Sequence, residues 1–115
     1  MIWKKRKAIY LFDFAFFKND ILVHQYNNLT YQEDIFVTED ICYNHKEKKL
    51  IRETDEHSFI IDFNNNELLL KLRSDNYAGN ITLLKSIVKE NNKDIEITYQ
   101  IDLDEPIYKI TITRR

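Results

Sequence analysis

The amino-acid sequence predicts an all-β fold, an antiparallel meander β-barrel of about eight to ten strands. First, apolar and polar residues alternate with period two in several segments, which is typical of strands with one buried face. Second, β-rich runs recur about every ten residues, a spacing that favours a sandwich or barrel over a parallel α/β sheet. Third, polar clusters rich in asparagine separate these runs. We therefore expect short strands joined by tight turns, in one domain covering residues 1–115.

Turns in this chain must be built with almost no glycine or proline, because it contains one of each. Asparagine tolerates positive φ and bonds its own backbone, so we expect turns at Asn27-Asn28, at residues 64–66 and at Asn91-Asn92. The expected strands are residues 7–17, 20–26, 30–38, 40–44, 48–54, 57–63, 67–74, 81–89, 94–103 and 107–114.

The first expected strand carries a run of aromatic residues with an aspartate among them. Tyr10, Phe12, Phe14 and Phe16 fall on one face, and Asp13 falls on the other. If the aromatic face points inward, Asp13 is exposed. If the opposite face points inward, Asp13 is buried and must be paired or protonated. Four aromatic side chains suit the interior of a small barrel, so we favour an exposed Asp13.

The central segment predicts a hairpin with apolar residues on both faces. Residues 59, 61 and 63 face one way, with Leu68, Leu70 and Leu72 as expected partners, and Ile60 and Leu69 lie on the opposite face. Isolated apolar residues are common on protein surfaces, and this is the preferred interpretation. The alternative is a contact patch, which would make the chain a homodimer through an exposed strand face.

Residues 81–89 are compatible with either a helix or a strand. Ile81, Leu84 and Val88 have helical spacing, and Asn80 is suited to cap a helix. The β-branched content and the lack of clean amphipathicity favour a strand instead. Periodicity alone does not separate the two structures.

The last two expected strands form a hairpin whose register is restricted by their apolar faces. The core positions are odd-numbered in residues 94–103 and even-numbered in residues 107–114, so paired residue numbers must sum to an odd value. Pairing Leu103 with Tyr108 satisfies this rule, whereas pairing Leu103 with Pro106 would place a proline in the ladder. The first register also sets opposite charges face to face, namely Asp102 opposite Lys109 and Glu96 opposite Arg115.

Composition indicates a soluble globular domain in a reducing compartment. Charged residues make up 31% of the chain and hydrophobic residues 43%, and the net charge of −2 gives no general attraction for nucleic acid. Cys42 is the only cysteine, which excludes an intramolecular disulfide and suits a cytoplasmic location. The amino-terminal apolar run is interrupted by Asp13 and is too short to span a membrane. The many lysine, asparagine and isoleucine codons indicate a low-GC, bacterial genome.

The order of features from residue 48 onward resembles a known family. LIRET at 50–54, ELLLKLRS at 67–74, NYAGNITL at 76–83 and the final ribbon are similar to the YwiB-like family of uncharacterised bacterial proteins, which are small calycin-like β-barrels. Arg52 matches an arginine at the end of a middle strand, Gly79 a glycine in a strand connection, and Tyr99 a tyrosine in the penultimate strand. The resemblance implies a barrel fold and a strand for residues 81–89. It implies no activity.

No catalytic or metal-binding arrangement is identifiable, so we predict no catalytic residue, no metal and no cofactor. Cys42 and His45 lack a second pair of metal ligands, and nothing orients them as a nucleophile and base. The candidate ligand-binding residues are Arg52, Asp13 and Tyr99. Arg52 could bind an anion bidentately, although a cross-strand pair with a carboxylate is the simpler interpretation.

We therefore expect a non-enzymatic cytoplasmic barrel that binds a small, largely apolar ligand or a protein partner. One alternative is a self-associating structural module with a packed core. A less favoured alternative is an oligonucleotide-binding barrel, whose basic groove would join residues 4–7 to Arg114 and Arg115. An interior cavity of a few hundred Å³ with a few convergent polar groups would favour the ligand-binding protein.

Overall fold

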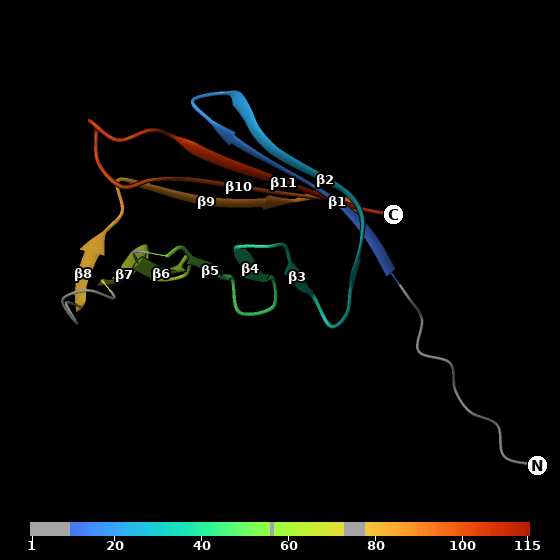
Figure 1. Ribbon diagram of the computed structural model, residues 1–115, viewed down its shortest axis with the longest axis horizontal. Coiled ribbons are helices and arrows are strands. Elements are labelled where there is room, and N and C mark those ends of the chain that lie inside the picture. Colours follow the sequence, from blue (N-terminus) through green and yellow to red (C-terminus); the bar gives the residue numbers. More distant parts are fainter. Residues whose placement is uncertain (1–9, 56, 73–77) are drawn as a thin grey trace, which may run out of the picture.

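The computed structural model describes residues 10–55, 57–72 and 78–115. These residues form two antiparallel sheets, which confirms the all-β class (Figure 1). Sheet A has the strand order β2 (Ile21–Tyr31), β1 (Tyr10–Lys18), β11 (Tyr108–Arg114), β10 (Asp94–Gln100) and β9 (Lys85–Glu90). Sheet B has the order β3 (Ile35–Val37), β4 (Ile41–Asn44), β5 (Lys49–Glu53), β6 (His57–Asp62), β7 (Glu67–Leu72) and β8 (Ala78–Thr82). Within these described ranges, no helix has the length and hydropathy needed to cross a membrane.

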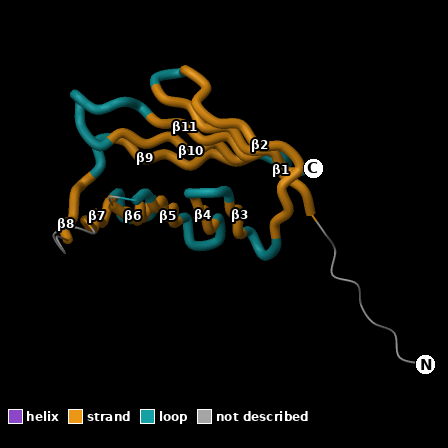
Figure 2. Tube along the Cα trace, viewed as in Figure 1, coloured by secondary structure: helices purple, strands orange, loops and turns teal. Residues whose placement is uncertain are grey.

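The two sheets face each other as layers, and their strands cross. In Figure 2 the strands of sheet A run across the view, whereas β4 to β7 of sheet B are seen nearly end-on. The chain passes between the sheets twice, from β2 to β3 and from β8 to β9. At the first passage only an isolated bridge between Gln32 and Ile35 forms. The ladders of the described residues therefore do not close into a barrel, and eleven strands replace the expected eight to ten.

The passage from β8 to β9 explains why the sequence pattern of residues 81–89 is ambiguous. The expectation of a strand at residues 81–89 is confirmed, but β8 ends at Thr82 and β9 begins at Lys85. Between them Leu83 turns its side chain into the core, with 2% of its surface exposed. Asn66 holds this corner, because its backbone carbonyl accepts a bond from the Leu83 N–H and its side-chain amide donates to the Leu83 carbonyl. The Ser86 hydroxyl donates to the Asn66 amide oxygen at 2.6 Å.

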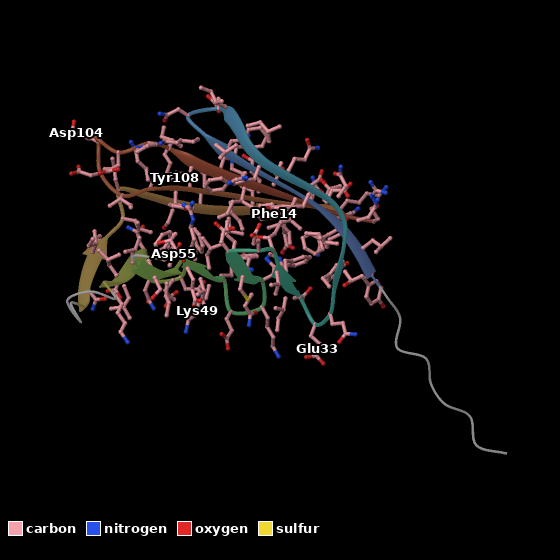
Figure 3. All side chains as sticks on the ribbon, viewed as in Figure 1. Phe14, Glu33, Lys49, Asp55, Asp104 and Tyr108 are labelled. Carbon is pink, nitrogen blue, oxygen red and sulfur yellow. The ribbon has the colours of Figure 1, made fainter. Side chains whose placement is uncertain are left out.

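The core lies between the sheets and follows the period-two pattern. Phe12, Phe14 and Phe16 are buried, as predicted, while Tyr10 at the start of β1 is half exposed. Figure 3 shows Phe14 in the space between the two layers. The buried hydrophobic residues are Phe12, Phe14, Phe16, Phe36, Ile41, Tyr43, Leu50, Phe59, Ile61, Leu68, Leu83, Ile95, Ile97, Tyr99, Ile110 and Ile112.

The central hairpin has the predicted faces, with Phe59 opposite Leu70 and Ile61 opposite Leu68. The expected turns at residues 64–66 and 91–92 also form, and Asn66 has φ of 56°. The expected turn at Asn27-Asn28 is wrong. These residues lie inside β2 at a β-bulge, where Asn28 has φ of 59°. Some bulges and some tight turns both use a left-handed residue, so the asparagine pair alone does not distinguish them.

The predicted register of the final hairpin is wrong, although its odd-sum rule holds. Tyr99, not Leu103, lies opposite Tyr108, and Ile97 lies opposite Ile110. β10 ends at Gln100 because the acidic residues that follow bond locally instead of joining a ladder. The Asp102 carboxylate accepts a hydrogen bond from the Leu103 N–H, and the Asp102 backbone carbonyl accepts one from the Glu105 N–H. Leu103 is consequently 78% exposed.

Some expected features fall outside the described residues. They are the strand positions 7–9 and 73–74 and the basic residues 4–7.

Candidate functional site

A pocket of about 360 Å³ opens between the two sheets, on the β8 side of sheet B. Both layers supply its walls, and most of the lining is apolar. The lining residues are Arg52, Thr54, Phe59, Leu68, Leu70 and Ile81 from the chain of sheet B, and Tyr99, Ile101 and Tyr108 from that of sheet A. A larger depression of about 530 Å³ lies at the β2–β3 connection and is lined by residues within 30–37, from the end of β2 to the end of β3.

The pocket walls follow from strand alternation, and a missing side chain adds to the space. Leu70 on β7 faces inward and lies opposite Gly79 on β8. Gly79 therefore sits inside a strand, not in the connection that the family resemblance implied, and no described glycine has positive φ. Because glycine has no Cβ, nothing from residue 79 covers Leu70 on the pocket side.

Arg52 reaches the pocket from β5. Its Nε lies 3.6 Å from the Asp40 Oδ2, and its guanidinium carbon lies 5.1 Å from the centre of the Phe16 ring. Asp40 precedes Ile41, which is opposite Arg52 in the ladder, so the carboxylate pair expected from sequence is present. The Arg52 Nε is nevertheless buried and makes no hydrogen bond with any described residue.

Tyr99 lines the same pocket from β10, so the structure brings two of the three predicted site residues together. Its hydroxyl is buried and makes no hydrogen bond within the described part of the chain. Burial raises the pKa of Tyr99, while the nearby Arg52 guanidinium opposes this rise. The ring stacks on Tyr108 at 5.1 Å, and Tyr108 stacks on Phe16 at 5.6 Å. Sequence reasoning missed Tyr108 because the predicted register paired it with Leu103.

Asp13, the third predicted residue, lies away from the pocket on the outer face of sheet A. Its Oδ1 accepts the backbone N–H of Asn28 at 2.9 Å, and its Oδ2 accepts two bonds from Arg115 at 3.0 and 2.7 Å. The Asn28 hydrogen bond and then Arg115 hold the pKa of Asp13 below its usual range. Asp13 thus joins the β2 bulge to the end of β11, which is a structural role.

A second polar cluster bridges the sheets at the opposite end of the interior. The Tyr43 hydroxyl and the His45 Nδ1 are 3.1 Å apart, and the His45 Nε2 lies 2.7 Å from the Glu90 Oε2. Burial, followed by the negative charge of Glu90, raises the pKa of Tyr43. The His45 bond lowers the pKa of Glu90. Unlike the pocket, this cluster pairs its buried polar atoms.

The remaining sequence candidates do not assemble into a site. Cys42 faces outward from β4, whereas His45 bonds inward to Tyr43 and Glu90. Among residues 10–55, 57–72 and 78–115, no group of three or more His, Cys, Asp or Glu side chains could hold a metal ion. Arg114 donates to the Lys93 and Asn91 carbonyls, and Arg115 is bound to Asp13.

The pocket offers binding groups and not an acid–base pair. Its lining contains a guanidinium and hydroxyls but no cysteine, histidine or carboxylate. Comparison with family models, curated proteins and solved structures finds no match to the chain.

Proposed function

We propose that the protein binds a small apolar molecule carrying one anionic or hydrogen-bond-accepting group in the pocket between the sheets. One observation carries the proposal. Two buried polar groups, the Arg52 Nε and the Tyr99 hydroxyl, make no hydrogen bond of good geometry with the described residues of this mostly apolar pocket, although the two side chains interact with each other and Asp40 lies 3.6 Å from the Arg52 Nε. More than about 90% of buried polar groups in proteins are paired, so two such groups at one cavity indicate a place for an external partner.

The energetics favour a ligand with both an apolar body and a polar end. A buried polar group without a hydrogen bond costs about 1–3 kcal/mol, and a ligand carboxylate could accept hydrogen bonds from Tyr99 and Arg52 at shorter range than the 3.6 Å that separates Arg52 from Asp40. An apolar body packed against Leu68, Leu70 and Ile81 would add about 25 cal/mol for each Å² removed from water. The volume of about 360 Å³ lies within the range of small-molecule sites.

We also propose that the scaffold is related to a calycin-like barrel, in which the closed barrel is replaced by two separate sheets. Its support is the order of the strands: β1 pairs with the last strand, β11, and within each sheet the remaining neighbours follow a meander. In a calycin-like barrel the ligand lies in the interior, which corresponds here to the space between the sheets.

Thermal unfolding with two matched probes, octanoate and 1-octanol, tests the proposal. Both have the same apolar chain, but only octanoate carries a charge for Arg52. We expect both to raise the melting temperature, octanoate more strongly. At about 100 times its Kd, a ligand stabilises the folded state by about 2.7 kcal/mol.

The variant Arg52→Gln distinguishes the contribution of the ligand's charged group to binding from that of its apolar chain. We expect this variant to lose the preference for octanoate over octanol and to keep the binding of octanol. Arg115→Gln is the matched control, since Arg115 lies outside the pocket and should leave both affinities unchanged. Absence of saturable binding by either probe, or an octanoate preference that persists in Arg52→Gln, contradicts the proposal.

A further inference from the structure

A row of apolar side chains crosses the outer face of sheet B. The ladders place Val37 opposite Cys42, Cys42 opposite Ile51, Ile51 opposite Ile60, and Ile60 opposite Leu69. Each member of this row, which we call the stripe, lies on a different neighbouring strand from β3 to β7. Val37 is 53% exposed, Ile51 and Ile60 are each 37% exposed, and Leu69 is 42% exposed. The residues that sequence suggested as scattered thus form one continuous line.

Polar rows flank the stripe on both sides. Residues two positions away on the same strands share its face, because side chains alternate along a strand. Figure 3 shows Lys49 on the side of sheet B that faces away from sheet A. On β5 to β7 the first rim row is Lys49, Asp62 and Glu67, and the second rim row is Glu53, Ser58 and Lys71. The first row continues through Asn44 on β4 to the exposed Ile35 on β3. An apolar centre with a polar rim is the usual anatomy of a protein interface.

We propose that the outer face of sheet B is a homodimer interface, with two copies packed face to face about a two-fold axis that runs along the stripe. Such an axis places each stripe residue opposite the same residue of the partner subunit. It also places the first rim row of one subunit opposite the second rim row of the other. Lys49 then faces Glu53 of the partner subunit, and Glu67 faces Lys71 of the partner subunit. The remaining rim position sets Asp62 against the partner's Ser58. The face is therefore complementary to itself, which a two-fold interface requires.

The other symmetric arrangement is less favourable. A two-fold axis along the strands, through the centre of β6, would also pair opposite charges at Lys49 and Lys71. However, it would place Asp62 against Asp62 of the partner subunit. Like charges brought together at an interface are costly, which favours the axis along the stripe.

The size of the face predicts a reversible dimer. Six strands spaced about 4.8 Å apart, with about 17 Å of usable strand length, give on the order of 500 Å² per subunit. Two such faces bury on the order of 1,000 Å², near the lower limit for specific interfaces. We therefore expect a concentration-dependent equilibrium between monomer and dimer.

Sedimentation of the purified chain from micromolar to millimolar concentration tests the interface. We expect dimer formation in the unmodified protein and its loss in Leu69→Lys and in Ile60→Lys, which bury an unpaired charge at the stripe. The matched control is Ile87→Lys, because Ile87 is 41% exposed but lies on β9 of the other sheet. Circular dichroism confirms that each variant remains folded. A chain that stays monomeric throughout, or a dimer that survives Leu69→Lys, overturns the proposal and leaves the stripe to a different partner.

Charge reversal tests the arrangement without altering the apolar centre. Lys71→Glu places a carboxylate against the partner's Glu67 and should weaken the dimer at least tenfold. Adding Glu67→Lys to this variant restores an opposite-charge pair and should recover the affinity. In the arrangement with the axis along the strands, the second change would add a clash with the partner's Lys49 and weaken the dimer further. Absence of rescue therefore overturns the axis along the stripe.

Cross-linking at Cys42, the only cysteine in the chain, gives an independent measurement. On the proposed axis Cys42 faces its own copy. Stacked sheets lie about 10 Å apart, beyond the reach of a disulfide, which needs Cα atoms within about 7 Å. A short bismaleimide should therefore link the two subunits, whereas oxidation should not. Failure to cross-link at concentrations where the dimer forms contradicts the arrangement. The pocket lies between the sheets, so ligand binding and dimerisation can fail separately.

Discussion

The two ends of the space between the sheets are built by the same alternating strands but are filled differently. At the packed end, near β3, the Phe36 ring lies 5.1 Å from Phe12 and 4.6 Å from Tyr31. At the pocket end, near β8, an open volume remains around Arg52 and Tyr99. β3 and β8 are opposite edges of sheet B, as Figure 1 shows.

The treatment of buried polar groups differs in the same way. Near the packed end, the Tyr43 hydroxyl is paired with His45. At the pocket end, the Tyr99 hydroxyl has no hydrogen bond within the described residues. Two tyrosines on core-facing strand positions thus have different surroundings. We infer that the packed end supplies stability and that the pocket end is kept available for a ligand.

The largest effect is expected at the packed end. Phe36→Ala should reduce the free energy of unfolding by about 3–5 kcal/mol, because Phe36 is 1% exposed and its loss leaves a cavity between tightly packed rings. Leu70→Ala at the pocket should cost about 2 kcal/mol, since Leu70 is only partly buried and borders existing space. Urea titration measures both values. Equal losses would remove the distinction between the two ends.

A smaller loss is expected when the paired tyrosine loses its hydroxyl. Tyr43→Phe leaves the buried His45 Nδ1 without its partner and should cost about 1–3 kcal/mol. Thermal unfolding of this variant beside the unmodified protein measures the cost. An unchanged melting temperature would show that the bond between Tyr43 and His45 adds nothing to stability.

The matched change at the pocket end should act in the opposite direction. Tyr99→Phe removes a buried hydroxyl that makes no hydrogen bond with the described residues, so the ligand-free protein should be equally stable or up to about 1 kcal/mol more stable. The same variant should bind octanoate more weakly. A loss of stability similar to that of Tyr43→Phe would mean that the Tyr99 hydroxyl is satisfied in solution and would weaken the case for the pocket.

The smallest effect concerns acid stability near the packed end. The His45 bond holds the pKa of Glu90 below its ordinary value of 4.5 in the folded state. A lowered folded-state pKa gives stability that is present above the ordinary pKa and is lost as pH falls through the folded pKa. Glu90→Gln should therefore lower the free energy of unfolding at neutral pH. The difference between this variant and the unmodified protein should become smaller below about pH 4. Parallel stability curves from pH 3 to 7 would exclude this contribution.

Much of the fold is predictable from sequence because alternation is a local property. The buried face of β1, the common face of Phe59 and Leu70, and the placement of Ile60 and Leu69 on the opposite face all follow from period two. The separation into two sheets depends on long-range contacts at Leu83 and could not be read in this way. The register of the last hairpin failed because local bonds to Asp102 end β10 early.

The candidate site was predictable only in part. Arg52 and Tyr99 were selected from the sequence, but their shared pocket depends on how sheet A crosses sheet B. Asp13 was misplaced because its partners, Asn28 and Arg115, are distant in sequence. Tyr108 was assigned to the core face of its strand, but the predicted register did not place it opposite Tyr99. Pairwise patterns identify faces, whereas a cavity requires the relative placement of several strands.

The left-handed backbone positions have a consequence for engineering. Among the described residues, those with positive φ are Asn19, Asp20, Asn28, Glu33, Asp34, Lys48 and Asn66, and none is glycine. Glu33 and Asp34 adopt a conformation that glycine or asparagine would tolerate with less strain. Glu33→Asn and Asp34→Gly should each add up to about 1 kcal/mol, outside the lining of the pocket between the sheets. Such changes would provide a more heat-resistant background in which disruptive variants of either surface remain folded and measurable.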